Sequence, residues 1–342
     1  MANRDILALG ASAGGFEALR HLAGQFPAGL QASVLVVIHL SEQFYSALDA
    51  ILTQAGRLPA RFAGDGDTLE RGQIYIAPAG CHMLIDGARL QLGRGPRENH
   101  ARPAIDPLLR STALCCGPRS VGVVLTGTLG DGASGLAALK QCGGITVVQD
   151  PEDAAYPEMP AAALRRSKPD YVVGLRSMGS LLERLLNQPQ GAAVPVPAAI
   201  RSEVEIARNG YAGLSVSERV DLMDRLGRRS ALACPDCHGV MWEIEEDALV
   251  RYRCHVGHAY GADLMSLALD ESLARALASA LRALDERISL FERMRRQAGD
   301  AGQERLARSW ALKAGELQQQ AAVIREAILR AEATAARHFQ EQ

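Results

Sequence analysis

Between residues 5 and 186, short apolar runs alternate with stretches of helical periodicity. The runs have the length and the β-branched content of buried strands, and several are followed by an amphipathic pattern. We expect strands at 6–9, 33–39, 73–77, 121–126, 145–149 and 171–174, and helices at 15–25, 132–142 and 178–186. This order predicts a Rossmann-like α/β domain with a doubly wound, mostly parallel sheet.

Three regions depart from the alternation. Residues 64–93 are rich in glycine and aspartate and carry strand-like pieces, which indicates a β-hairpin excursion. Residues 187–199 contain three prolines and are typical of a linker. Beyond residue 262, two apolar stripes at helical spacing flank a break at 299–302, so two helices folded into a hairpin are expected.

A domain plan follows from these patterns and from a group of cysteines and histidines after residue 230. We expect an α/β domain, a linker with a short helical segment, a small zinc-ribbon-like Cys/His module and an α-helical hairpin. Their predicted ranges are 1–187, 188–230, 231–262 and 263–342.

Composition narrows the range of partners. The formal net charge is −2 and aromatic residues make up 4% of the 342 residues, so neither a basic surface nor stacking platforms for nucleic acid are expected. No apolar run is long enough to span a membrane, and residues 1–5 do not resemble a signal peptide. We therefore expect a cytoplasmic protein that inserts into no membrane.

Polar side chains occur at the predicted carboxyl ends of three strands, where ligands and catalytic groups gather in open α/β sheets. Ser12 lies in Gly10-Ala11-Ser12-Ala13-Gly14, which fits the G-x-S-x-G pattern of a nucleophile elbow. His39 ends the second strand, and Asp131 follows the strand at 121–126. Serine, histidine and aspartate are the components of a hydrolytic triad.

Other interpretations apply to each residue alone. Ser12 and Asp131 are also typical helix-capping or turn residues, and His39 alone fits a structural histidine. The glycines around Ser12 also fit a dinucleotide-binding loop. That loop calls for an acidic residue at the end of the second strand, where this sequence has His39. Three matching residue types at three strand ends favour the triad.

The segments around these residues resemble the CheB-type chemotaxis-receptor protein-glutamate methylesterases. The resemblance rests on "LALGASAGGFEAL" with Ser12, "VVIHL" with His39 and "VVLTGTLGDGASGL" with Asp131. Further matching segments are "GQIYIAPAGCHMLI", "RPAIDPLLRSTA" and "PEDAAYPEMPAAAL", and the resemblance extends from residue 5 to about residue 186.

The resemblance implies a carboxylic ester hydrolase that removes γ-methyl esters from glutamates on the cytoplasmic helices of methyl-accepting chemotaxis receptors. Some members of the family also deamidate glutamine, so the resemblance implies this as a possible second activity. Ser12 is then the nucleophile, His39 the general base and Asp131 the residue that orients the histidine, and no cofactor is needed for catalysis. No receiver-like segment precedes residue 5, so we expect control by means other than an attached receiver domain.

The loop facing the serine departs from the family pattern. Thr128 stands where the family has methionine, and Leu129 where glycine is usual. We expect this loop, with the backbone of Ala13 and Gly14, to form the oxyanion side of the site. An alternative function is therefore a catalytically weak or inactive member that binds receptors or signalling complexes.

The module at 231–262 has metal-ligand spacing. Cys234-x2-Cys237 is followed by Cys254 and by His255 and His258, which is typical of a zinc ribbon. The three cysteines are the expected thiolate ligands, and His258 is preferred over His255 as the fourth ligand. A closed site of four ligands predicts structural zinc. The length of the apolar stripes in the terminal helices suggests a helical partner or a homodimer through those helices.

Overall fold

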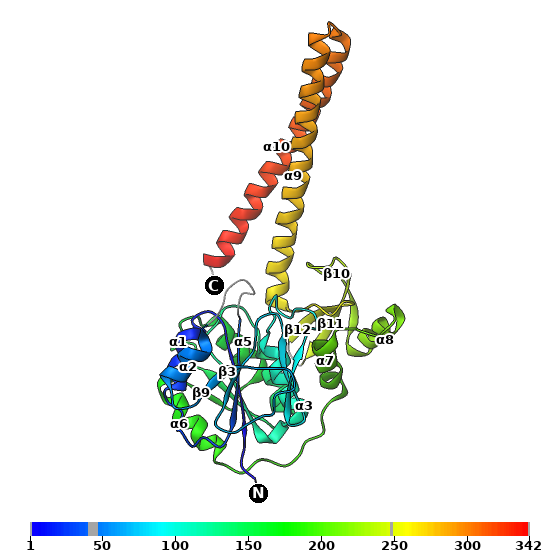
Figure 1. Ribbon diagram of the computed structural model, residues 1–342. Coiled ribbons are helices and arrows are strands. Elements are labelled where there is room, and N and C mark those ends of the chain that lie inside the picture. Colours follow the sequence, from blue (N-terminus) through cyan, green and yellow to red (C-terminus); the bar gives the residue numbers. More distant parts are fainter. Residues whose placement is uncertain (1, 40–46, 247–248, 341–342) are drawn as a thin grey trace. The chain divides into compact units, whose positions relative to one another are not determined.

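The computed structural model describes residues 2–39, 47–246 and 249–340 (Figure 1). The chain forms two compact units, Met1–Leu264 and Met265–Gln342. The first unit contains the predicted α/β domain and also the Cys/His module. The second consists of most of one long helix and all of the next.

The first unit is built on a seven-stranded sheet in which all neighbouring strands run parallel. The predicted parallel α/β fold is therefore confirmed, and the predicted strands are present with ends shifted by a few residues. The short edge strand β3 had no clear signal in the sequence. In spatial order the strands are β3 (Ala60–Phe62), β4 (Ile74–Ile76), β2 (Ser33–Ile38), β1 (Ile6–Ala11), β7 (Ser120–Val124), β8 (Ile145–Gln149) and β9 (Tyr171–Val173).

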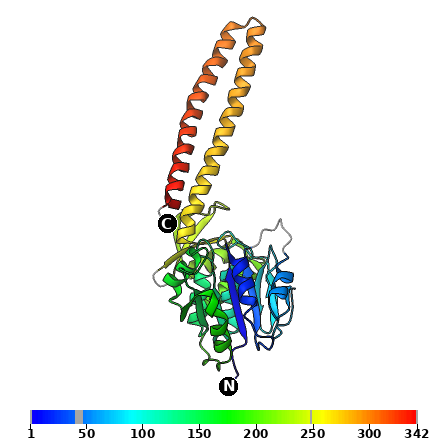
Figure 2. The ribbon, with the colours of Figure 1, turned by 90° about the vertical axis from the view of Figure 1, so that its left-hand side faces the viewer.

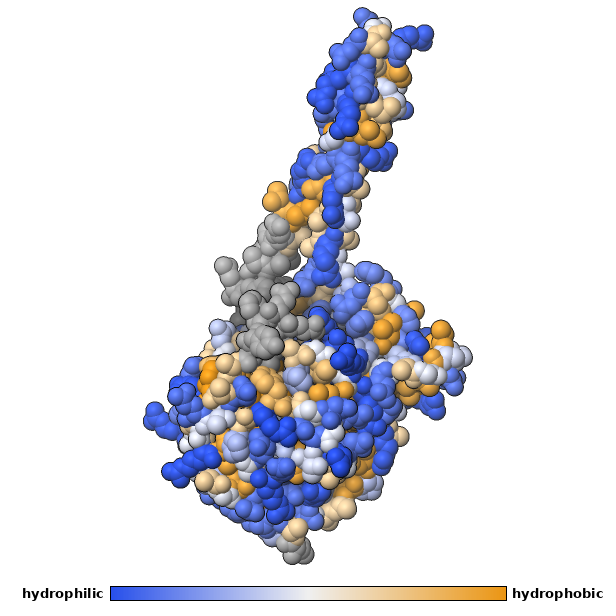
Figure 3. All heavy atoms as spheres, in the orientation of Figure 1, coloured by the Kyte–Doolittle hydropathy of each residue, from blue (hydrophilic) through white to orange (hydrophobic). Residues whose placement is uncertain are grey.

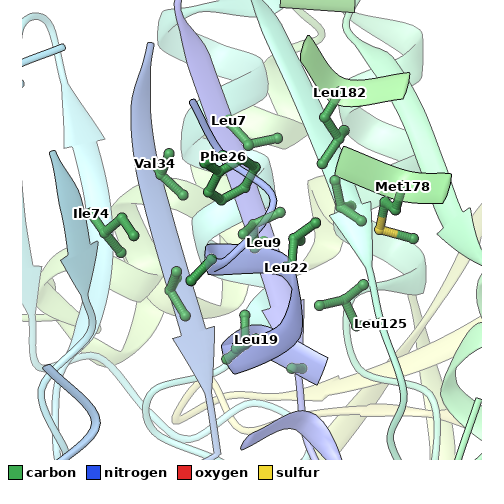
Figure 4. Close-up of a cluster of buried hydrophobic side chains, with 14 of the residues drawn as sticks. Leu7, Leu9, Leu19, Leu22, Phe26, Val34, Ile74, Leu125, Met178 and Leu182 are labelled. Carbon is green, nitrogen blue, oxygen red and sulfur yellow. The ribbon is translucent and has the colours of Figure 1, made fainter. Parts of the chain in front are cut away.

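Helices cover both faces of this sheet (Figure 2). Every residue of β1 and β2 is buried, which explains why these strands read as continuous apolar runs. Leu7, Leu9 and Val34 pack on one face against Leu22 of α1 and Met178 of α6 (Figure 4). That face is covered by α1 (Gly15–Ala23), α2 (Leu48–Ala55) and α6 (Leu175–Leu186). The other is covered by α3 (Ile105–Cys115), α4 (Ala133–Gln141) and α5 (Glu158–Ser167), with the 3-10 turn η1 (Gly117–Arg119) after α3.

The predicted hairpin excursion is also confirmed. Strands β5 (His82–Asp86) and β6 (Arg89–Gly93) pair antiparallel outside the main sheet. Helix α7 (Ala198–Asn209), which follows the proline-rich stretch, packs against this hairpin and against α3.

The Cys/His module is a four-stranded antiparallel sheet with one helix before it. Trp242 is buried in its small core and donates a hydrogen bond from Nε1 to Asp224 Oδ1 at 2.7 Å. The elements are α8 (Val216–Leu226), β10 (Arg228–Ala233), β11 (Val240–Glu246), β12 (Leu249–Cys254) and β13 (Ala259–Gly261).

Two long helices follow, α9 (Ala262–Asp300) and α10 (Glu304–Gln340), so the predicted hairpin and its break are confirmed. Phe291 packs on Trp310 with ring centroids 5.2 Å apart, and Arg325 pairs with Asp285 at 2.7 Å. Hydrophobic residues reach the hairpin surface between hydrophilic ones (Figure 3). Among the described helices, none combines the length and the apolar character needed to cross a membrane.

Candidate active site

Ser12 lies in a tight turn between β1 and α1. Its backbone C=O accepts a hydrogen bond from the N–H of Gly15 at 2.8 Å, and Gly14 adopts a positive φ of 71°. A Cβ on Gly14 would lie only 3.0 Å from the Cβ of Ala155, so both conformation and space call for glycine. Gly14 is the N-cap of α1 and no side chain caps this helix, so Ser12 does not serve as its cap.

The structure brings Ser12, His39 and Asp131 together in one hydrogen-bonded chain. Ser12 Oγ lies 2.9 Å from His39 Nδ1, and His39 Nε2 lies 2.8 Å from Asp131 Oδ2. The Asp131 side chain is buried, whereas 24% of the His39 side chain is exposed to solvent. The aspartate therefore meets the histidine inside the protein, and the serine–histidine pair is reached from solvent.

Asp131 is held by more than the histidine. The backbone N–H groups of Ile105 and Asp106, at the start of α3, donate to its carboxylate at 2.6 and 3.2 Å. Burial alone would raise the pKa of Asp131, but the hydrogen bond and charge of His39, together with the Ile105 N–H, lower it below its usual range. Asp131 is thus an anion placed at a helix N-terminus, a setting that stabilises negative charge.

Two further residues of the site were not anticipated from the sequence. Asn99 Nδ2 donates to Asp131 Oδ1 at 3.0 Å and to Asp106 Oδ2 at 3.1 Å. Burial and the neighbouring charge of Asp131 raise the pKa of Asp106 to about 6. Asp106 lies within the segment "RPAIDPLLRSTA", which pointed to this region, but nothing in that segment marked its side chain.

Backbone donors and a second loop complete the surroundings of Ser12. Within the described part of the chain, the N–H groups of Ala13 and Gly14 donate to no acceptor. Thr126 joins the two loops, since its C=O accepts from Ser12 N at 3.0 Å and its Oγ1 donates to Ala13 O at 3.1 Å. Thr128 lies further along this loop and is partly exposed.

Leu129 adopts the left-handed conformation, with a φ of 65°, and is partly exposed. This is the conformation that glycine adopts most readily, so leucine at this position follows a glycine-like backbone path.

A second group of candidate functional side chains lies in the module. The ligand atoms of Cys234, Cys237, Cys254 and His258 lie within 4.8 Å of one another. Cys237 Sγ is 3.6 Å from Cys254 Sγ, and His258 Nδ1 is 3.6 and 3.5 Å from the sulfurs of Cys234 and Cys254. His255 lies against Gly239 and is not part of this group. Three thiols and one imidazole form a set of ligands that could bind a metal ion.

Buried charges join the module to the α/β domain. Glu98 and Glu203 are paired with Arg110 of α3 and with Arg251 and Arg253 of β12, and all five side chains are almost fully buried. We call this set the arginine–glutamate cluster. Burial alone would raise the pKa of Glu98 and Glu203, but the arginines lower both below the usual range, so the two carboxylates are ionised.

A parallel α/β sheet with a Ser–His–Asp hydrogen-bonded chain at its strand ends defines a class of proteins built like triad hydrolases. Within that class, a family model for the CheB methylesterase matches residues 7–182. The chain belongs to the CheB methylesterase family.

Individual relatives agree with this assignment. The chain is 36% identical over 191 residues to protein-glutamate methylesterase/protein-glutamine glutaminase 2 of Methanosarcina mazei, which covers 54% of this chain and 52% of that protein. It is 38% identical over 187 residues to protein-glutamate methylesterase/protein-glutamine glutaminase 1 of Xanthomonas campestris pv. campestris, covering 54% and 52%. The chain therefore spans about half the length of these curated relatives.

A solved structure is similar as well. The crystal structure of the Thermotoga maritima CheB methylesterase catalytic domain aligns with a TM-score of 0.51 at 27% identity. The alignment covers 99% of that chain and 54% of this one.

Proposed function

We propose that this chain is a protein-glutamate methylesterase that hydrolyses the γ-methyl esters of glutamate residues on chemoreceptor helices. The observation that carries the proposal is the hydrogen-bonded chain of Ser12, His39 and Asp131 at the carboxyl ends of the sheet strands. Protein-glutamine glutaminase, named with the methylesterase in the relatives, is the second activity of the same site, because an amide and an ester are both attacked at the acyl carbon.

The triad divides the reaction into two steps. Ser12 Oγ attacks the ester carbonyl while His39 Nδ1 accepts the hydroxyl proton, and the histidine then returns this proton to the departing methanol. Water next attacks the glutamyl-serine ester with His39 again as the base, which releases glutamate and restores Ser12. Asp131 keeps the Nε2–H of His39 directed toward itself and stabilises the imidazolium that forms in each step.

The turn after β1 supplies the groups for the oxyanion. The N–H groups of Ala13 and Gly14 are not engaged elsewhere in the described chain and lie at the N-terminus of α1, where the helix dipole favours negative charge. We assign these two N–H groups as oxyanion donors.

The loop at Thr128 and Leu129 supports an active enzyme over a receptor-binding protein without turnover. Leu129 keeps the positive φ at a place where the resemblance calls for glycine, so the loop does not need a different backbone path. Gly127, in the same loop, approaches Ser12 so closely that a Cβ on it would lie 2.8 Å from Ser12 Cβ. The loop therefore stays close to the nucleophile.

The segments that frame Ser12 present apolar side chains to the substrate. Phe16, Leu129 and Tyr156 are 39%, 38% and 44% exposed. The apolar face of an amphipathic receptor helix could pack against these three side chains and bring a methylated glutamate to Ser12. This favours a helical protein substrate over a small ester.

Methanol release from receptor carrying labelled methyl esters tests the proposal. We expect turnover by the wild-type chain and loss of it in Ser12→Ala and His39→Gln. Thr53→Ala is a matched control, because Thr53 is a surface hydroxyl on α2 whose partner is the Ala60 backbone. Equal methanol release by wild type and Ser12→Ala would contradict the assignment.

The module supports a structural zinc ion. Tetrahedral zinc with Zn–S of about 2.3 Å and Zn–N of about 2.0 Å places its ligand atoms roughly 3.5–3.8 Å apart. Three of the separations fit this spacing: Cys234–His258 and Cys237–Cys254 at 3.6 Å, and Cys254–His258 at 3.5 Å. Four protein ligands close the site, so the metal stabilises the module and takes no part in ester hydrolysis. Elemental analysis should find one zinc per wild-type chain and loss of it in Cys237→Ser.

The exposed apolar side chains of the terminal hairpin support self-association of the chain. Leu312 and Val323 on α10 are 72% and 68% exposed, and a homodimer through these helices would cover such side chains. Sedimentation of the wild type and of Leu312→Glu tests this, because a charge in a dimer contact shifts the equilibrium to the monomer.

A further inference from the structure

The segment between β6 and α3 joins the α/β domain, which carries the triad, to the Cys/His module within the unit Met1–Leu264. Asn99 N–H donates to the C=O of Ala259 at 2.8 Å, and Ala259 N–H donates back to Arg97 O at 3.4 Å. Glu98 forms a bridge to the same residue of β13. Ala259 directly follows His258, one of the four candidate metal ligands.

The side chain of Asn99 uses all its hydrogen-bonding groups at this junction. Its Nδ2 donates to one carboxylate oxygen of Asp131 and to one of Asp106, at 3.0 and 3.1 Å. Its Oδ1 accepts from the N–H of Gly261 in β13 at 3.2 Å. The Asn99 amide therefore lies between two buried carboxylates, and its oxygen is bound by the backbone of the module.

A tight turn formed by residues 98–101 sets the orientation of this amide. Glu98 and Ala101 exchange two backbone hydrogen bonds, of 3.2 and 2.9 Å, around Asn99 and His100. Both central residues have positive φ, 50° and 61°, which is the pattern of a type I′ turn and one that asparagine tolerates well. Glu98 is anchored on either side by Arg110 of α3 and Arg253 of β12.

We propose that Asn99 is a positioning residue of the triad, and that β13 of the Cys/His module holds it in place, so that the module forms part of the active-site support. The proposal rests on the esterase function proposed above. Asn99 fixes the carboxylate of Asp131 opposite His39 and separates it from Asp106. Without the amide, the two carboxylates face each other with fewer donors between them.

Other groups also surround Asp131. His39 faces it from the end of β2, Asp106 from α3, and the buried His82 of β5 lies within electrostatic range. A new negative charge at position 99 therefore acts on His39 and Asp106 together. The extra charge favours the imidazolium, so the acidic limb of the pH–rate profile moves to higher pH.

The first test compares Asn99→Ala and Asn99→Asp with the wild type in the full chain. Asn187→Ala is the control, because Asn187 is exposed at the end of α6. Two rates are measured across pH: methanol release from methylated receptor, and labelling of Ser12 by a fluorophosphonate probe. The labelling reports on the serine–histidine pair without the natural substrate.

We expect Asn99→Ala to reduce kcat and the labelling rate by roughly 10- to 100-fold with KM little changed, since positioning acts on the reaction and not on binding. We expect Asn99→Asp to move the acidic limb of both profiles upward by about one pH unit. Rates and profiles within twofold of wild type in both variants would overturn the proposal.

Failure of the proposed function gives a different result. A wild type that is labelled at Ser12 but releases no methanol refutes the esterase, while its labelling still decides the role of Asn99. A wild type that neither reacts with the probe nor releases methanol overturns both.

The second test perturbs the module. Metal removal by a chelator, or Cys254→Ser if the chain proves to be metal-free, should raise amide hydrogen exchange at residues 97–101. It should also slow labelling of Ser12 about tenfold in wild type, and add little to the effect of Asn99→Ala because the two changes act through one contact. Unchanged exchange and labelling, or fully additive losses, would show that the module does not support the triad.

Discussion

Glu203 offers a direct test of how the module is joined to the α/β domain. Its carboxylate accepts from Arg251, from Arg110 at 3.1 Å and from Arg253 at 3.4 Å, and its side chain is 3% exposed. The arginine–glutamate cluster holds three cations and two anions. Glu203→Gln keeps the shape of the side chain but leaves three buried arginines with Glu98 as their remaining carboxylate in the cluster.

The size of the effect follows from this count. Hydrogen bonds to charged groups contribute about 1.5–3 kcal/mol each, and the glutamine oxygen can still accept some of them. Removing one partner of a buried ion pair typically costs about 3–5 kcal/mol. We therefore expect the free energy of unfolding to fall by about 4 kcal/mol, which in a domain of this size lowers Tm by roughly 8–16 °C.

Tryptophan fluorescence can follow the unfolding of the module. The chain has two tryptophans, of which Trp242 is buried in the module and Trp310 lies in α10. In a Trp310→Phe background, the thermal transition reports on Trp242. Glu205→Gln on the same helix is the matched control, because Glu205 is exposed and its loss should cost less than about 0.5 kcal/mol. A Glu203→Gln transition within about 2 °C of this control would refute the reasoning about buried charge balance.

Three further predictions concern the metal, the loop and pH. Removal of the proposed zinc ion should lower the Tm of the Trp242 transition by more than 10 °C, because metal binding contributes roughly 10–16 kcal/mol to folding in comparable sites. An unchanged transition after verified metal loss would contradict a structural site. Leu129→Val should cost about 1 kcal/mol, because a β-branched residue tolerates positive φ poorly, whereas Leu129→Gly should leave Tm nearly unchanged; equal losses in thermal unfolding would refute strain at this position. The pKa of Asp106 is about 6 in the folded protein and near 4 in the unfolded chain. Between pH 4 and 6 this carboxyl therefore ionises more readily in the unfolded chain, and the free energy of unfolding falls as the pH rises. Asp106→Asn removes that loss, and its Tm relative to wild type should rise over this interval; a difference independent of pH would contradict it.

The sequence pattern predicted the sheet well because its central strands are buried on both faces. The helices expected from the pattern did not include α3, in which every residue from 105 to 113 is buried. Ser12, His39 and Asp131 could be named as candidates because each follows a strand, and the carboxyl ends of parallel strands share one edge of the sheet.

Asn99 and the arginine–glutamate cluster could not be predicted in this way. The position of Asn99 depends on a turn with two positive φ values and on pairing with β13, which is about 160 residues away in the chain. The members of the cluster come from α3, α7, β12 and the segment before α3. In the sequence, isolated charged residues of this kind are typical of a protein surface. Their burial depends on the packing of the module against the α/β domain, which the sequence pattern does not show.

The central claim is that Ser12 is the nucleophile of a glutamate methylesterase. The most direct measurement is methanol release from methyl-labelled receptor membranes by the wild-type chain and the Ser12→Ala variant side by side. We expect steady turnover by wild type and a loss of at least about 10³-fold in the variant, since removal of a triad serine is among the largest single losses known in hydrolases. Equal release by the two proteins, or none by a folded wild type, would contradict the claim.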